Sequence, residues 1–179
     1  MTPTNFLQAI QGRAARVTLG ASALRSQGPG IADAARLFFA ALPLRPFAVL
    51  GSKTFARRLD QTTAALQATF PPGTGSWGLA RKLLNIFLRE ALYTRYLDDK
   101  YHLAKAEPFF ELPLDSITAE QLLDQPQAHL PRWPGVKHLS PEVSVEYQLA
   151  AAEHAAGLGI ARVHLDAIWW GGSRGKNAA

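Results

Sequence analysis

The chain has 179 residues, 47% of them hydrophobic, and a formal net charge of +5. That length suits one domain, or one compact unit of two small helical lobes around a cleft. A core of this size can fold without disulfides or a structural metal ion. The absence of cysteine excludes structural disulfides, thiolate zinc sites and cysteine nucleophiles.

The charge is distributed unevenly along the chain. Residues 1–97 contain 12 Lys and Arg against 3 Asp and Glu, whereas residues 98–179 contain 7 against 11. The net +9 of the first part predicts a basic face for a polyanion such as nucleic acid. The alternative is that these basic residues are spread over several helices as ordinary solvated charge.

No apolar stretch approaches the roughly 20 residues that span a bilayer. The basic N-terminus, MTPTNFLQAIQGRAARVTLGASALR, lacks a continuous apolar region and a convincing cleavage site. We therefore expect a soluble, cytoplasmic, monomeric protein with no membrane partner.

Almost every segment of the first part has helical spacing of apolar residues. Gly- and Pro-rich stretches (QGPG, PLRP and PPGTG) separate helices expected over 4–18, 31–42, 52–70 and 76–97. Ser52 is the expected cap of the third. The fourth is the longest, and its expected core face comprises Ala80, Leu83, Leu84, Phe87, Leu88 and Ala91.

The second part continues in the same way. Residues 98–110 are expected to be loop, a short helix follows Asp115, and a helix begins at Ser140-Pro141, a typical N-terminal signal. A last helix covers 160–170. No alternating strand occurs, so the predicted fold class is all-α, with one domain over 1–170 and a flexible tail over 171–179.

Several kinds of site are missing. The chain has no P-loop, dinucleotide fingerprint, HExxH or GxSxG motif. Its histidines are scattered, none paired at helical spacing, which argues against a histidine metal site; they are His102, His129, His138, His154 and His164. We expect no metal and no cofactor.

The stretch FPPGTGSWGLARK predicts a tight hairpin between two helices. Gly73 and Gly75 permit positive φ, and backbone N–H groups at the following helix start can bind phosphate. Arg81 and Lys82 add cations nearby, and Trp77 is placed for a base or a sugar. The alternative is that the two glycines only make a turn.

Lys82, Asn85 and Arg89 form one polar stripe on the helix that follows, opposite its core face. A solvated stripe is the ordinary interpretation. A lysine amine can also attack a sugar carbon and form a Schiff base, which makes Lys82 a candidate nucleophile.

Asp115, in PFFELPLDSITAEQLL, is an isolated acid at a helix start after an apolar run. It can cap the helix by accepting from the N–H groups of Ile117 or Thr118, although Thr118 with Gln121 offers a competing capping box. A carboxylate in such surroundings can also stabilise an oxocarbenium ion or activate water. Cap and catalyst are compatible, since one oxygen can remain free.

The last helix contains a second isolated acid, Asp166, followed by Trp169 and Trp170. These three residues are candidates for a base pocket. Adjacent tryptophans face different directions on a helix, so at most one of them is expected to line a pocket; the alternative is that they cover the core.

Together these residues resemble the helix–hairpin–helix superfamily of DNA glycosylases. PGTGSWGLARKLLNIF and LPLDSITAEQL carry its Pro-Gly-x-Gly hairpin, its lysine in the following helix and its aspartate opening a later helix. The archaeal 8-oxoguanine glycosylase branch is closest, because its stretch between lysine and aspartate is also long and GIARVHLDAIWWG resembles its closing helix. The resemblance covers roughly residues 50–170.

The resemblance implies excision of a base flipped out of DNA. Asp115 would be the catalytic carboxylate and Lys82 the Schiff-base lysine of an associated AP lyase. Gly73 and Gly75 would hold a backbone phosphate, with Trp77, Arg81, Asn85 and Arg89 as further DNA contacts. Many bifunctional relatives carry the lysine inside or directly after the hairpin, where this chain has Trp77 and Gly78, so a monofunctional enzyme is equally compatible.

Other hypotheses stay open. The substrate can be 8-oxoguanine or a bulky, hypermodified pyrimidine, and the setting can be repair or defence against modified phage DNA. A non-catalytic helical DNA-binding module would instead leave the hairpin, Lys82 and Asp115 on open surface. An all-α protein-interaction domain would show an exposed apolar patch.

Overall fold

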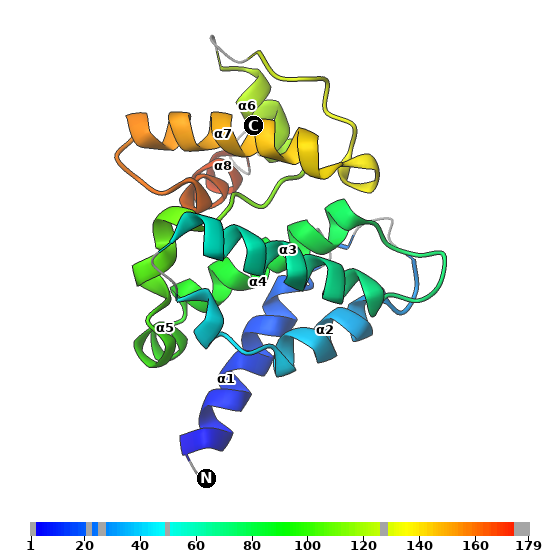
Figure 1. The fold of residues 1–179 in the computed structure, drawn as a ribbon, viewed down its shortest axis with the longest axis vertical. Coiled ribbons are helices and arrows are strands. Elements are labelled where there is room, and N and C mark those ends of the chain that lie inside the picture. Colours follow the sequence, from blue (N-terminus) through cyan, green and yellow to red (C-terminus); the bar gives the residue numbers. More distant parts are fainter. Residues whose placement is uncertain (1–2, 21–22, 25–27, 49–50, 126–128, 174–179) are drawn as a thin grey trace.

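The computed structural model describes residues 3–20, 23–24, 28–48, 51–125 and 129–173. This part of the chain folds into a compact arrangement of helices without strands, as expected (Figure 1). The helices are α1 (Pro3–Thr18), α2 (Ile31–Ala41), η1 (Arg45–Phe47), α3 (Ser52–Ala68), α4 (Trp77–Tyr93), α5 (Arg95–Tyr101), η2 (Leu103–Phe109), α6 (Ser116–Leu123), η3 (Val136–His138), α7 (Pro141–Gly157), η4 (Arg162–His164) and α8 (Leu165–Ser173). The expected tail is helical as far as Ser173, and residues 174–179 lie outside the described residues.

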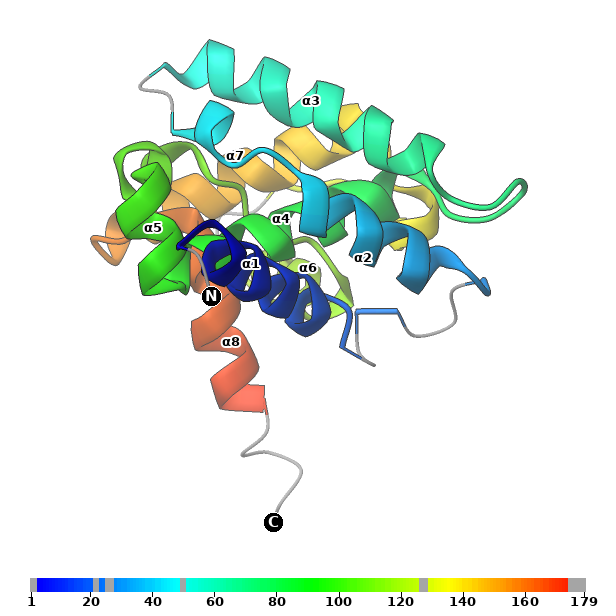
Figure 2. The same ribbon diagram turned by 90° about the horizontal axis from the view of Figure 1, so that it is seen from below.

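Helix α4 runs through the middle of the fold (Figure 2). It contacts α1, α3, α5, η2 and η3. All six residues of its expected core face are buried, which confirms that prediction. The opposite side is buried as well, because Arg81, Lys82 and Asn85 are each less than a tenth exposed. The polar stripe of α4 is therefore mostly buried, and its most exposed member is Arg89, with a side chain 15% exposed.

The hairpin before α4 is a tight turn between α3 and α4. Gly73 and Gly75 both have positive φ, and the Thr74 N–H donates to the Pro71 carbonyl over 3.0 Å. A Cβ at Gly75 would come within 2.2 Å of the Phe70 ring, whereas one at Gly73 would meet nothing within 4 Å. Helix α4 then starts at Ser76, whose hydroxyl accepts from the Leu79 N–H.

Several helix boundaries differ from the expected ones. The helix expected over 76–97 is interrupted at Thr94, which has an extended backbone and donates its hydroxyl to the Glu90 carbonyl over 2.7 Å. Such side-chain bonding to the backbone competes with helix continuation. The expected loop over 98–110 is helical, as α5 and η2, and Asp98 there accepts from the Ala104 N–H. Ser52 is not a cap, since the N-cap position of α3 is Gly51.

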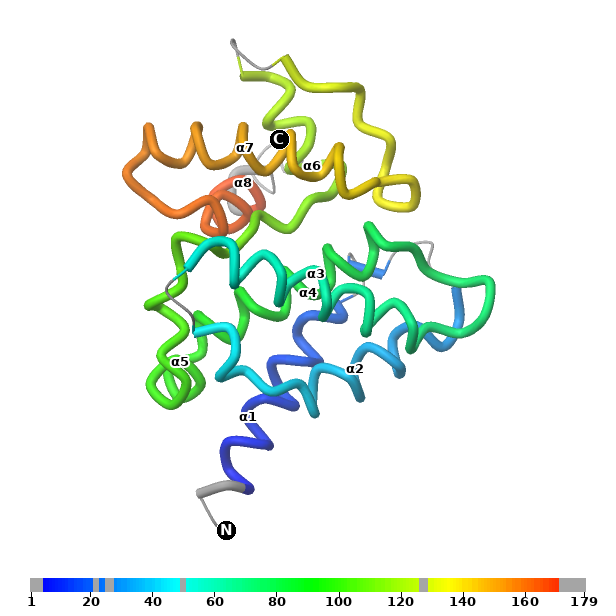
Figure 3. Tube along the Cα trace, in the orientation of Figure 1, coloured from blue at the N-terminus to red at the C-terminus, as the bar shows by residue number. Residues whose placement is uncertain are grey.

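The buried hydrophobic residues form two clusters. The first is built mainly from α1 to α5, and the second from α6, α7, the start of α8 and the chain that leads into them. The Cα trace shows α6, α7 and α8 grouped on one side of α4 (Figure 3). Residues 109–115 pass from one cluster to the other: Phe110 belongs to the first, and Leu112 and Leu114 belong to the second.

Candidate functional site

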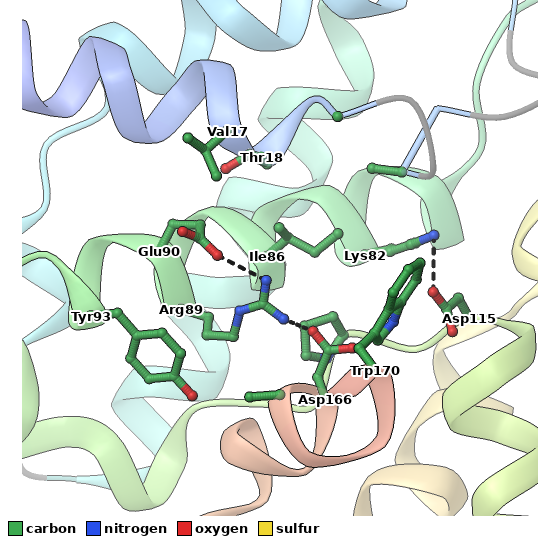
Figure 4. A pocket seen from close by; sticks show the side chains of 14 residues that line it. Val17, Thr18, Lys82, Ile86, Arg89, Glu90, Tyr93, Asp115, Asp166 and Trp170 are labelled. Atoms are coloured by element: carbon green, nitrogen blue, oxygen red, sulfur yellow. Dashed lines mark hydrogen bonds and ion pairs between the residues drawn. The ribbon is translucent and has the colours of Figure 1, made fainter. Parts of the chain in front are cut away.

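Lys82 and Asp115, which are 33 positions apart in the sequence, meet in an ion pair. Lys82 Nζ lies 3.4 Å from Asp115 Oδ2 (Figure 4). The side chains are only 8% and 12% exposed, respectively. An amine and a carboxylate are thus held together at the wall of a cavity with little water around them.

The second oxygen of Asp115 caps α6. Oδ1 accepts from the N–H groups of Ile117 and Thr118 at 3.0 and 3.1 Å, and the Thr118 hydroxyl accepts from the Asp115 N–H at 2.9 Å. This reciprocal capping box replaces the expected competitor, in which Thr118 with Gln121 would have started the helix. The start of α6 does depend on Asp115, and its remaining oxygen faces Lys82.

The chain leading to Asp115 is held in place by side chains from α7 and η4. Arg162 donates to the carbonyls of Phe109 and Phe110 at 3.3 and 3.1 Å. The Gln148 amide both donates to the Leu112 carbonyl and accepts from its N–H, at 2.8 and 3.0 Å. These bonds satisfy backbone groups that no strand partner satisfies, and they fix the path of the segment.

Glu111, in the same segment, holds two of the predicted DNA contacts. Arg81 donates to both Glu111 oxygens at 2.8 and 2.9 Å and to Asp60 at 2.8 Å, and Asn85 donates to Glu111 at 3.1 Å. Burial alone would lower the pKa of Arg81, but the two carboxylates outweigh it and raise the pKa. Arg81 and Asn85 are therefore buried and engaged with protein groups.

A cavity of about 340 Å³ opens between α1, α4 and α8, and we call it the α8 pocket. Five of the candidate residues line it: Lys82, Arg89, Asp115, Asp166 and Trp170. Arg89 forms ion pairs with Asp166 and with Glu90. Trp170 lies between the Arg89–Asp166 pair and the Lys82–Asp115 pair (Figure 4). The pocket thus combines an aromatic face, a donor–acceptor pair and the amine–carboxylate pair.

A second cavity, of about 350 Å³, adjoins the first, and we call it the η3 pocket. It is lined by the loop that contains η3, including Trp133, Lys137 and His138. Lys82, Asp115 and Trp170 line both cavities. The amine–carboxylate pair therefore stands where the two pockets meet.

The other candidate residues lie outside both cavities. Trp169 packs on the second cluster, with its ring 5.7 Å from that of His154. Trp77 also packs on this cluster, under the Arg81 guanidinium at 5.5 Å. Gly73 and Gly75 belong to the hairpin, and neither lines the α8 or the η3 pocket.

Sequence reasoning missed a hydrogen-bonded chain beside the α8 pocket. The Tyr93 hydroxyl lies 2.8 Å from His164 Nδ1, and His164 Nε2 lies 3.0 Å from Glu107. Burial and the carboxylates of Glu90 and Glu107 raise the pKa of Tyr93, against the opposing effect of Arg89. The phenol therefore stays protonated at neutral pH and can donate to Nδ1. The three residues come from different elements, so no local pattern signals them.

Among the described residues, no group of three His, Asp or Glu side chains could hold a metal ion. Within the same part of the chain, no helix has the length and apolar character needed to cross a membrane. In comparisons with known proteins, no family model, no curated protein and no solved structure matches this chain.

Proposed function

We propose that this protein is a DNA glycosylase that removes a damaged or modified base flipped into the α8 pocket. The observation that carries the proposal is the buried pair of Lys82 Nζ and Asp115 Oδ2, 3.4 Å apart at the wall of that pocket. An amine that can attack a sugar carbon, next to a carboxylate that can stabilise an oxocarbenium ion, is the combination that base excision requires.

The rest of the pocket supports binding of a base. A flipped base would stack on the Trp170 indole, since every base offers a π face to an aromatic side chain. Asp166 and Arg89 would face its edge with an acceptor and a donor. Whether that base is 8-oxoguanine or a hypermodified pyrimidine stays open in this proposal.

The chemistry can be written with all atoms balanced. Asp115 takes one proton from the Lys82 ammonium, and the freed Nζ attacks C1′ as the C1′–N bond breaks. The departing base keeps the bonding electron pair and takes up the proton that Asp115 holds. One N–H proton of the new C1′–Nζ bond then moves to O4′ as the C1′–O4′ bond breaks and the sugar ring opens, which gives the protonated Schiff base from which an AP lyase nicks the strand. In a monofunctional enzyme, water attacks C1′ instead and Asp115 accepts its proton.

We further propose that α3, the hairpin and α4 form a helix–hairpin–helix unit, and that the two hydrophobic clusters act as two small lobes around the cleft. The positive φ of Gly73 and Gly75 and the Ser76 cap support the first assignment. In this role the hairpin holds a backbone phosphate of the bound DNA.

The burial of the pair favours an enzyme over a non-catalytic DNA-binding module. Such a module would leave Lys82 and Asp115 on open surface. Instead, the Lys82 side chain is only 8% exposed and the Asp115 side chain only 12% exposed. An interaction domain would need an exposed apolar patch. Val145 and Leu149 on α7 are exposed large hydrophobics one helical turn apart, and they are the surface on which that alternative would rest.

Borohydride trapping on oligonucleotides that carry a panel of modified bases tests the proposal. We expect a covalent adduct with the wild type that is lost in Lys82→Met and kept in Lys100→Met, a matched change at an exposed lysine of α5. Base release without an adduct, lost in Asp115→Asn, would indicate the monofunctional enzyme. If no base on the panel is released and Asp115→Asn binds DNA like the wild type, the glycosylase proposal is wrong.

A further inference from the structure

We propose that the η3 pocket holds the phosphodiester backbone next to the flipped nucleotide, with Lys137 and His138 as its contacts. This inference rests on the glycosylase proposal and adds the direction of the bound strand. The base enters the α8 pocket, and the strand continues through the η3 pocket. Neither residue belongs to the hairpin, to α4 or to the catalytic pair.

The charges of the two pockets differ, and this difference sets the direction. The α8 pocket contains Glu90 and Asp166 in addition to the shared Asp115, and its Arg89 is already paired with both of these carboxylates. A phosphate placed there would meet the negative charges of Glu90 and Asp166, which already offset the positive charge of Arg89.

The η3 pocket has the opposite character. Besides the shared Lys82 and Asp115, its charged or titratable side chains are Lys137 and His138. Both are exposed, and neither has a partner among the described residues. A lysine ammonium of this kind offers three N–H donors to phosphate oxygens. Trp133 in the same pocket gives an aromatic face on which a neighbouring base can stack.

The η3 loop is held against α4, so the backbone of Lys137 and His138 has a fixed position relative to the catalytic pair. Gly78 makes the approach possible, because a Cβ there would lie 2.2 Å from the Val136 carbonyl oxygen. The Ser76 hydroxyl donates to the same carbonyl at 3.3 Å. On the other side of the loop, the Tyr147 hydroxyl donates to the Pro131 carbonyl at 2.8 Å.

The order of groups along the cleft therefore matches the order in a nucleotide. The base would contact Trp170 and the Arg89–Asp166 pair in the α8 pocket. The sugar would lie next to Lys82 and Asp115, which line both pockets. The adjoining phosphate would reach Lys137 and His138 in the η3 pocket. A strand that continues beyond the target should bind better than the target nucleotide alone, because only a strand supplies the adjoining phosphodiester.

The test measures binding of an oligonucleotide with a tetrahydrofuran abasic site, by fluorescence anisotropy over a series of salt concentrations. Loss of one phosphate contact lowers the slope of log K against log [salt] by about 0.7 on single strands and about 0.9 on duplex. We expect that decrease, and roughly tenfold weaker binding at low salt, for Lys137→Ala. Lys100→Ala, the same charge change at an exposed site on α5, should keep the wild-type slope.

Two outcomes would overturn the inference. One is a Lys137→Ala protein that matches Lys100→Ala in slope and affinity while the wild type still releases bases, which would leave the glycosylase proposal standing. The other is a 5′-mononucleotide that binds as tightly as the oligonucleotide and is equally weakened by Lys137→Ala, since the pocket would then hold a free nucleotide's phosphate. A wild type that neither binds DNA nor releases any base contradicts the proposed function itself.

Discussion

Asp115 divides its two carboxylate oxygens between structure and pocket. Oδ1 accepts two backbone N–H groups at the start of α6, and Oδ2 faces Lys82 at 3.4 Å. The capping bonds hold the carboxylate in one orientation, so the second oxygen does not have to be ordered when substrate binds. The same side chain therefore starts a helix and presents a negative charge to the pocket.

These two roles can be separated by mutation. Asp115→Asn keeps a carbonyl oxygen for the cap but removes the charge, whereas Asp115→Ala removes both. We expect both variants to release base at least about 100-fold more slowly. Only the alanine variant should lose the further roughly 1 kcal/mol of a helix cap. Single-turnover base release and urea unfolding measure the two effects, and an Asn variant with wild-type release would contradict the catalytic role.

The helix start that follows Asp115 is what separates it from Glu111 in the sequence. Both are single acids in one apolar run, four positions apart. In the structure, Glu111 pairs with Arg81, while Asp115 meets Lys82 at the pocket. The helix start at Asp115 could be predicted from the local sequence. The partner of each acid could not, because both partners lie on α4, far away in the sequence.

In residues 109–115, the chain leaves η2 at Phe109 and continues as an extended segment without a strand partner. Arg162 and Gln148 bind its backbone, and Glu111 in turn binds Arg81 and Asn85 on the polar side of α4. This side of α4 therefore has two uses: Arg81 and Asn85 hold the segment, while Lys82 and Arg89 line the pocket. Substitution of Arg81 or Asn85 should therefore lower the stability of the fold and affect ligand binding only indirectly.

Arg81 has two carboxylate partners, which offers a matched pair of variants. Glu111 is 12% exposed and Asp60 is 65% exposed. Removing one partner of a buried ion pair costs about 3–5 kcal/mol, whereas exposed pairs contribute about 1 kcal/mol or less. We therefore expect Glu111→Ala to lower the free energy of unfolding far more than Asp60→Ala, in urea titrations of both. Equal losses would show that Glu111 is not the dominant partner.

Helix boundaries were harder to predict than helices. Apolar spacing correctly indicated a buried face for α4, because that face repeats with the period of a helix. The break at Thr94 and the helical turns over 103–109 coincide with single side-chain bonds, from the Thr94 hydroxyl to the Glu90 carbonyl and from the Ala104 N–H to the Asp98 carboxylate. Such bonds leave the apolar pattern unchanged, so periodicity could not reveal them.

At the scale of the whole molecule, the two hydrophobic clusters share α4 and the 109–115 segment. Side chains of α4 fill the first cluster, and Trp77 at its start packs on the second. The buried Arg81–Glu111 pair adds a polar connection between α4 and the segment. Unfolding of either cluster would expose these shared elements, so the two should unfold together.

The tryptophans offer a direct measurement of this coupling. Trp77, Trp133 and Trp169 pack on the second cluster, and Trp170 lines the two pockets. Tryptophan fluorescence therefore follows the second cluster, whereas far-UV circular dichroism follows the helices of both. We expect the same denaturation midpoint from both signals, as for a two-state domain. Separate midpoints would mean that the clusters unfold independently.

The position of two pocket residues on α4 has a consequence for the size of a ligand. Lys82 and Arg89 are seven residues apart, which at about 1.5 Å per residue separates their Cα atoms by roughly 10 Å on nearly the same side of the helix. A continuous helix thus sets the distance between the backbone positions of the amine and the guanidinium. One residue inserted between them would turn Arg89 by about 100° around the axis and away from the pocket. The spacing of these two charged groups is therefore a property of helix geometry, and it does not depend on the loops that line other parts of the pocket.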